Sequence, residues 1–193
     1  MKRSHPVFAA AMSIAVLLAG IGANAQVGPQ MRETKTADGL LIVSSVEGNY
    51  FRMRIRGKNV SRLHTTKKYW YTADGVRFQF FSEENVNFVM TDVPTLPDGT
   101  VLKLYRSDYL RRFADGKPRL RSSWLKLANN KTALLFTSES RSAAPQIFIV
   151  IATPMHVFGL FAPVKAGQTD AQVKRVLIRT LGTFKFGEAE AGL

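Results

Sequence analysis

The chain contains no cysteine. This absence excludes disulfides, a thiolate nucleophile and the soft thiolate ligands of a structural zinc site. It also excludes a lipid anchor on a cysteine next to a cleaved leader. A domain of roughly this length buries about 70% of its unfolded surface. Packing alone can therefore hold this chain together.

Acidic residues are also scarce. The chain has 14 acidic and 27 basic residues, and its formal net charge is +13 at pH 7. Such a charge attracts polyanions over long distances, although it says nothing about the fold. We expect the partner to be an acidic protein or an anionic polymer of the cell envelope. Nucleic acid is not the expected partner, because the start of the chain indicates export.

Only the first 25 residues contain a long apolar run. Lys2 and Arg3 precede the apolar stretch Val7–Gly22, and Ala23-Asn24-Ala25 places small residues at the positions that a signal peptidase reads. We predict a signal peptide over residues 1–25 and a periplasmic or secreted product. The alternative, an uncleaved anchor, is disfavoured by the cleavage site. We expect no integral membrane segment after cleavage, since later apolar runs are interrupted.

The rest of the chain is dominated by strand patterns. Tyr50–Arg56 alternates strictly between apolar and basic residues, which is typical of a half-buried strand. Asp74-Gly75 predicts a tight hairpin turn. The apolar run Gln146–Thr153 fits a central strand covered on both faces, and its sequence does not decide which face meets a helix.

One helix is clearly indicated near the C-terminus. Over Thr169–Leu181 a capping box, formed by Thr169 and Gln172, precedes apolar residues at helical spacing. A second, short helix is indicated over Ser107–Phe113. Thr100–Tyr105 is compatible with either a strand or a helix.

These elements predict an α+β fold. We expect a single twisted antiparallel sheet with a long C-terminal amphipathic helix packed on one face, against Ile147, Ile149 and Ile151 or their neighbours on the opposite face. Residues 26–38 are predicted to be a flexible lead-in, residues 39–187 the single domain and residues 188–193 a frayed tail.

The most specific candidate site is a row of basic residues. Arg52, Arg54 and Arg56 project from one strand face about 7 Å apart, and Lys58 continues the row in register. An anionic partner would relieve their mutual repulsion, and guanidinium groups suit carboxylate or phosphate. The alternative is a solvated face balanced by acids on neighbouring strands. A second basic cluster contains Arg111, Arg112, Lys117, Arg119 and Arg121.

No catalytic grouping is evident. We find no nucleophile elbow, no zinc-protease motif and no phosphate-binding loop, and we expect no metal and no cofactor. His156 borders an apolar strand, where an acid or base role competes with that of a partly buried histidine bonded to the backbone.

The order of elements in the second half resembles the PsbP/Mog1/DcrB-like α/β sandwich family. The residues that carry this resemblance are Trp124–Ala128, Leu134–Ser138, Ile147–Ala152 and Val173–Phe186. The resemblance is topological and implies an accessory, chaperone-like or binding module rather than an enzyme.

We therefore expect an exported binding or accessory protein that docks its partner through Arg52, Arg54, Arg56 and Lys58, together with Arg119 and Arg121. Two alternatives are an envelope hydrolase that uses His156 and an immunity or inhibitor protein directed against an exported toxin.

Overall fold

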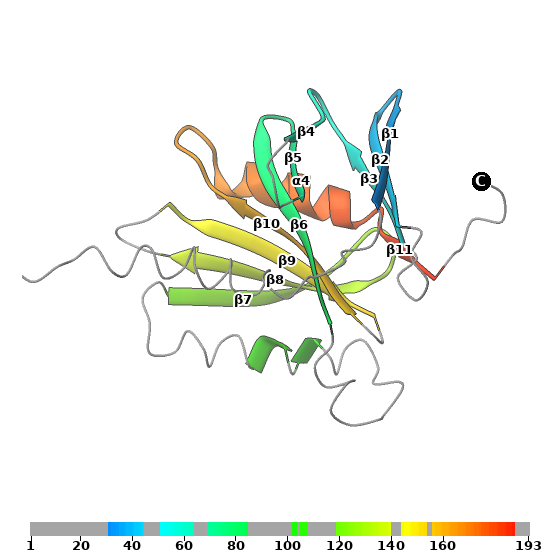
Figure 1. The fold of residues 1–193 in the computed structure, drawn as a ribbon. Coiled ribbons are helices and arrows are strands. Elements are labelled where there is room, and N and C mark those ends of the chain that lie inside the picture. Colours follow the sequence, from blue (N-terminus) through cyan, green and yellow to red (C-terminus); the bar gives the residue numbers. More distant parts are fainter. Residues whose placement is uncertain are drawn as a thin grey trace, which may run out of the picture.

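The computed structural model describes residues 31–44, 51–63, 69–84, 102–103, 105–107, 119–139, 144–153 and 156–187. Within them the chain is mostly β, with strands in two antiparallel sheets (Figure 1). The four-stranded sheet has the order β1 (Met31–Thr36), β2 (Gly39–Ser44), β3 (Phe51–Arg56) and β11 (Lys185–Phe186). The seven-stranded sheet has the order β4 (Ser61–Leu63), β5 (Tyr69–Ala73), β6 (Val76–Glu84), β10 (His156–Pro163), β9 (Gln146–Ala152), β8 (Thr132–Glu139) and β7 (Arg119–Lys126).

The prediction of an α+β fold with a single sheet and a long helix was therefore wrong. The strands divide between two sheets, and helix α4 (Asp170–Leu181) has only 12 residues. Alternation shows which side of a strand is buried but not which strands share a sheet. Here Gly57 ends β3 with a φ of 145°, and the next strand, β4, belongs to the larger sheet.

Several local predictions are confirmed. β5 and β6 pair across Asp74 and Gly75, whose φ angles of 50° and 77° suit a tight turn, and β3 alternates between buried and outward-facing residues over Phe51–Arg56. Thr169 caps α4 by accepting a bond from the Gln172 backbone N–H at 3.2 Å. Residues 31–36, assigned from sequence to the lead-in, form β1.

The ambiguous stretch Thr100–Tyr105 is helical where it is described, at residues 102–103 and 105, and the helical residues continue to Ser107. The rest of the short helix expected over Ser107–Phe113 lies outside the described residues. The strand expected over Val86–Thr91 lies outside the described residues. No helix in the described part of the chain is long and apolar enough to cross a membrane.

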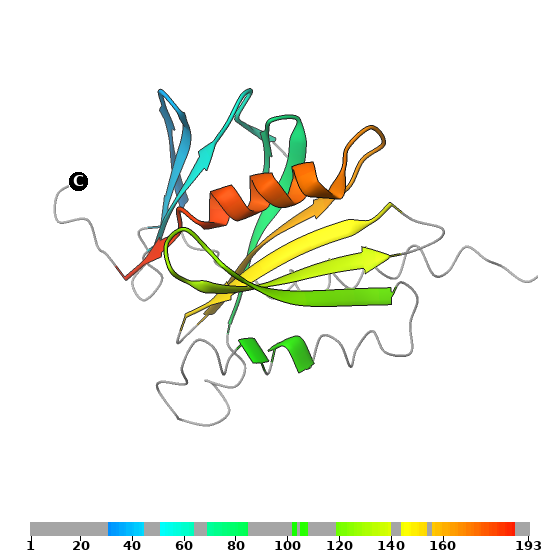
Figure 2. The same ribbon diagram turned by 180° about the vertical axis from the view of Figure 1, so that it is seen from behind.

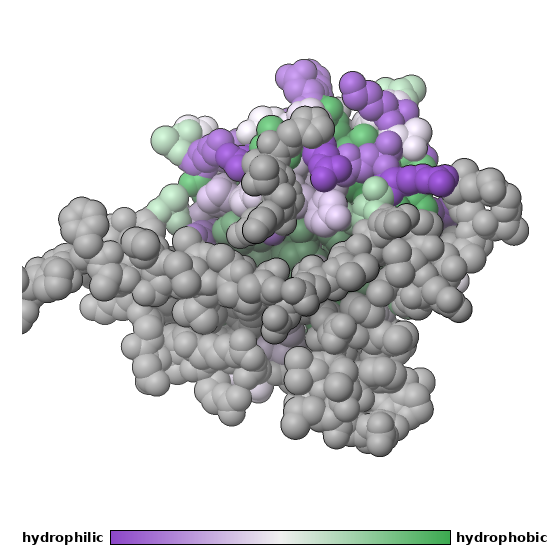
Figure 3. Space-filling model, viewed as in Figure 1, coloured by the Kyte–Doolittle hydropathy of each residue, from purple (hydrophilic) through white to green (hydrophobic). Residues whose placement is uncertain are grey.

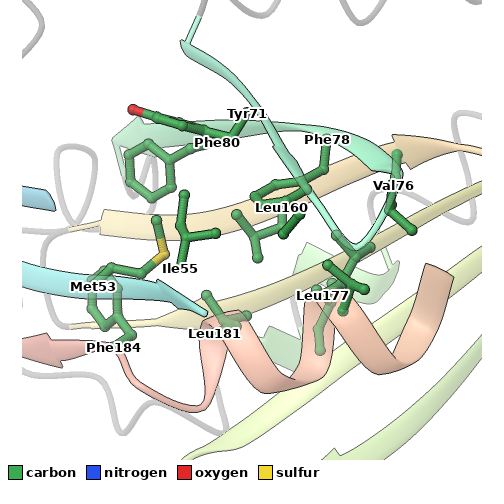
Figure 4. Packing of buried hydrophobic residues seen from close by; sticks show 14 of the residues in the cluster. Met53, Ile55, Tyr71, Val76, Phe78, Phe80, Leu160, Leu177, Leu181 and Phe184 are labelled. Atoms are coloured by element: carbon green, nitrogen blue, oxygen red, sulfur yellow. The ribbon is translucent and has the colours of Figure 1, made fainter. Parts of the chain in front are cut away.

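The main core lies between the two sheets. We call the side of the seven-stranded sheet that faces this core its first face, and the opposite side its second face. Helix α4 packs on the first face, beside the four-stranded sheet (Figure 2). Odd-numbered β9 residues meet the helix, which settles the question that the sequence left open. Figure 4 shows side chains from β3, β5, β6, β10 and α4 pointing toward one another. This cluster includes Met53, Ile55, Phe78, Phe80, Ile147, Ile149, Ile151, Leu160, Val173, Leu177 and Leu181.

The second face of the seven-stranded sheet carries its own apolar cluster. Even-numbered residues of β8 and β9 pack with Leu102, and the Tyr105 ring lies edge-on to Phe136 with 6.4 Å between centroids. β9 is therefore covered on both faces, which explains why its sequence is continuously apolar. Val150 and Phe148 face this cluster.

Gly159 makes room for an aromatic ring on the second face. It pairs with both Val150 and Phe81, and a Cβ atom at this position would lie 2.3 Å from Cζ of Phe81. The Phe81 ring of β6 therefore lies over Gly159 of β10. A larger residue at position 159 would collide with this ring.

Two polar links join distant elements at the border between the sheets. Tyr71, on β5, donates its hydroxyl proton to Glu33 of β1 over 2.9 Å, and Arg62 of β4 forms an ion pair with the same carboxylate at 3.1 Å. Burial is the main cause, and the neighbouring carboxylate the second, of a strongly raised Tyr71 pKa. The Tyr71 hydroxyl points out of the apolar cluster (Figure 4).

Asp74 makes the second link. Its carboxylate accepts bonds from the Arg179 guanidinium of α4 and from the Lys58 backbone N–H, the latter at 2.6 Å. Arg179 also donates to the carbonyl of Arg56 at 2.6 Å. This arrangement ties the β5–β6 turn, the β3–β4 connection and the helix together. The Arg179 bond, followed by the Lys58 bond, holds the pKa of Asp74 below its usual value.

The Gly159→Ala variant is expected to be destabilised by about 1–3 kcal/mol, the usual effect of overpacking a filled site. Urea denaturation measures the change. Phe81→Leu removes the ring that the new methyl group would meet. The double variant should therefore lose less stability than the sum of the two single variants, and strict additivity would contradict this packing.

The Asp74→Asn variant should lose about 1 kcal/mol at neutral pH, a small value because the pair is partly exposed. Asparagine tolerates the positive φ, so the turn itself is kept. Because the folded-state pKa of Asp74 is lowered, its charge stabilises the protein above the ordinary aspartate pKa. This stabilisation disappears as the pH falls through the lowered value. Denaturation at several pH values should show wild type and variant converging in acid, whereas a pH-independent gap would contradict the assignment.

Candidate anion-binding face

The outer side of the four-stranded sheet gathers basic side chains from three strands. Because residues alternate along a strand, Arg52, Arg54 and Arg56 lie opposite the buried Phe51, Met53 and Ile55. The register places Arg32 of β1 and Lys185 of β11 in one row with Arg52. We call this surface the basic face; its residues are Arg32, Arg52, Arg54, Arg56 and Lys185.

Among the residues that the structure describes, one acid lies at the basic face: Asp38, in the turn between β1 and β2. Its Oδ2 atom lies 3.0 Å from Nε of Arg56 and 3.5 Å from a terminal nitrogen of Arg54, while Thr36 donates to Oδ1 at 2.9 Å. The Thr36 bond, followed by the two arginines, lowers the pKa of Asp38. Two guanidinium groups therefore converge on one carboxylate.

Gly39 fixes the position of this acid. It has a φ of 147°, and a Cβ atom there would lie 1.9 Å from the carbonyl oxygen of Ile55. Only glycine allows β2 to approach β3 this closely beside the turn. The sequence Asp38-Gly39 thus sets the carboxylate beside the end of the arginine row.

Thr183 holds the other side of β3. The register that pairs Lys185 with Arg52 places Thr183 beside Arg54, just before β11 begins. Its hydroxyl accepts the Arg54 backbone N–H at 2.8 Å and lies 2.9 Å from the Arg54 carbonyl and 2.7 Å from that of Thr180. One side chain therefore continues the pairing where the short strand stops.

The structure assembles only part of the predicted site. Arg52, Arg54 and Arg56 share the basic face as expected, but Lys58 does not extend their row. The strand ends at Arg56, and Lys58 lies exposed in the turn that bonds to Asp74. The distorted Gly57 backbone accounts for the break in alternation.

The second predicted cluster is not joined to the first. Arg119 and Arg121 lie on β7, at the far edge of the seven-stranded sheet, and the side chain of Arg119 is outside the described part. Arg111, Arg112 and Lys117 also lie outside the described residues. Sequence proximity in a basic segment did not indicate which surface it would reach.

Sequence reasoning missed Arg32 and Lys185. The alternation in Met31–Thr36 was a usable signal, because Arg32, Thr34 and Thr36 fall on one side. Lys185 lies between Phe184 and Phe186, which also alternates. Arg32 joins the row through the local pairing of β1, β2 and β3, whereas Lys185 lies beside Arg52 through the long-range pairing of β11 with β3.

The surface view agrees with this placement. Hydrophilic side chains, in purple, gather over the upper part of the molecule where Figure 1 places β1 to β3 (Figure 3). The outer side chains of β2, Leu41 and Val43, are half-buried between the basic residues. They provide an apolar floor along the middle of the basic face.

The catalytic alternative depends on His156, whose side chain the structure does not describe. His156 begins β10 and pairs with Glu84 in the Cα register, and both side chains lie outside the described part. Within the described ranges no three histidine or acidic residues are grouped to hold a metal ion.

No family model matches the chain, and no curated protein or solved structure is significantly similar to it. The resemblance to the PsbP/Mog1/DcrB-like family therefore stays a prediction.

The Thr183→Val variant should lose about 1–2 kcal/mol of folding stability, because the half-buried backbone groups of Arg54 lose their partner without a change in side-chain shape. Hydrogen exchange should show faster exchange of the Arg54 amide, and urea denaturation should give the energy. Thr183→Ser keeps the hydroxyl and should stay close to wild type. An unchanged Arg54 amide in the valine variant would contradict the assigned contact.

Proposed function

We propose that this chain is an exported binding or accessory protein of the bacterial envelope, and that it docks an acidic protein or an anionic envelope polymer through the basic face. The observation that carries the proposal is the convergence of Arg54 and Arg56 on the Asp38 carboxylate. Two arginines already arranged around one carboxylate supply a geometry that a partner's carboxylates can also use.

The Asp38 ion pairs do not block such docking. The side chains of Arg54, Arg56 and Asp38 are 38%, 51% and 45% exposed. Ion pairs this exposed contribute little to stability, because water and salt screen them. A polyvalent anion that contacts several cations at once therefore displaces Asp38 at little cost.

The remaining positive charge lies at the other end of the basic face. Arg52 is directly opposite Lys185, with Arg32 two strands away in the same row. This row runs across the width of the four-stranded sheet. A partner that presents several anionic groups can therefore contact cations along the whole basic face.

Export is part of the proposal and is supported by the leader pattern over residues 1–25. Outside the cytoplasm, the abundant anions are envelope polymers, anionic lipids and acidic proteins. The formal charge, which is +13 for the whole chain and 13 − 2 = +11 once Lys2 and Arg3 are removed with the leader, favours encounter with any of them through long-range attraction.

Poly-L-glutamate and a polyuronate are suitable probes, with affinity measured over a salt series. We expect both to bind and their affinity to fall steeply as salt rises. The double substitution Arg52→Ala with Arg54→Ala should weaken binding, whereas Asp38→Asn should strengthen it because the competing carboxylate loses its charge.

The double substitution Lys174→Ala with Arg175→Ala is the matched control, since both cations lie on α4, away from the basic face. It changes the net charge by the same amount as the double substitution in the row. Equal weakening by this control would show a response to net charge alone. Binding that ignores salt, or that survives the double substitution, would reject the proposal.

A further inference from the structure

The strand β7 is a long edge strand whose outer side is paired with no described strand. It has eight residues and bonds on one side to β8, at the end of the seven-stranded sheet. Both ribbon views place it at the lower edge of that sheet (Figures 1 and 2). An edge of this length presents a row of backbone donors and acceptors that another strand can pair with.

The other described edge strands are shorter, and β1 is also bonded to the neighbouring sheet. β4 has three residues and β11 has two, which limits pairing. β1 has six residues, but its Glu33 is bonded to Tyr71 and Arg62 of the neighbouring sheet. β7 is longer than these edges; Nε of Arg106 donates to its Ser122 hydroxyl at 2.8 Å, which is a side-chain contact on the second face and not a strand pairing. β7 is therefore the edge best suited to accept an added strand.

A second observation on β7 points to a partner. Trp124 is 44% exposed and is the one large apolar side chain classed as exposed among the described residues. Its neighbour across the strand pair, Leu134, is fully buried in the second cluster. Trp124 therefore lies at the outer edge of the second apolar cluster. Tryptophan is enriched among the residues that contribute most to binding at protein interfaces.

The charges on β7 select the kind of partner. Arg121 and Ser123 are exposed on the first face, and Trp124 projects from the second face. Lys126 is exposed on the same face as Trp124, and the strand has no acid. Pairing with a second copy would bring like charges together, whereas an acidic segment is complementary.

We propose that β7 accepts an extended acidic segment of a partner protein as an additional strand. Residues of that segment alternate, so that acidic side chains face Arg121 and apolar side chains cover Trp124. This surface is separate from the basic face and does not depend on the function proposed for it.

The test uses the full chain and a capped ten-residue peptide that alternates valine with glutamate. NMR-detected hydrogen exchange should show new protection at alternate amides of β7 when the peptide is added. A peptide with alternate backbone amides N-methylated keeps its charges but loses strand hydrogen bonds, and should bind about tenfold more weakly. Trp124→Ala should weaken binding as well.

Two variants separate this surface from general charge effects. Arg175→Ala on α4 should bind the peptide as wild type does. The double substitution Arg54→Ala with Arg56→Ala disables the basic face and should leave the β7 protection intact. The proposal is overturned if β7 gains no protection, if N-methylation has no effect, or if β7 is protected without peptide in a concentration-dependent dimer.

Discussion

The structure depends on the need to cover β9 on both faces. From Ile147 to Ala152 every residue of β9 is apolar, so both faces of the strand have to be covered. Burial of apolar surface is the main source of folding stability. The odd-numbered residues of β9 are covered by α4 and the four-stranded sheet, and the even-numbered residues by the cluster around Leu102. The two layers on the first face follow from this requirement, since a 12-residue helix covers only part of a seven-stranded sheet.

The basic face follows from the way the four-stranded sheet uses its two sides. The four-stranded sheet uses one side, with Phe51, Met53 and Ile55, to complete the core. Its other side is left to carry charge, and β3 alternates accordingly. Two bonds then link the small sheet to the large one. Glu33 of β1 accepts from the Tyr71 hydroxyl of β5, and Asp74 accepts from the Lys58 backbone N–H just after β3. Core packing and surface charge are therefore encoded by the same strands in alternate positions.

The sequence predicts the local elements well and their assembly poorly. The β5–β6 hairpin, the cap at Thr169 and the arginine row depend on contacts between near neighbours, which the residue pattern records. The division into two sheets depends on Gly57 and on the pairing of β11 with β3, which joins residues more than 120 positions apart. The same long-range pairing brings Lys185 to the site, and no local pattern encodes it. Lys58 was misplaced because one glycine ended the strand two residues before it.

The basic face is built from both ends of the folded chain. Arg32 belongs to the first strand and Lys185 to the last, with the entire seven-stranded sheet encoded between them. Every strand of the larger sheet is therefore synthesised before the strand that finishes the smaller one. Because pairing between such distant segments is slow, the row from Arg32 to Lys185 is completed late, and a chain that stops before β11 lacks its last cation.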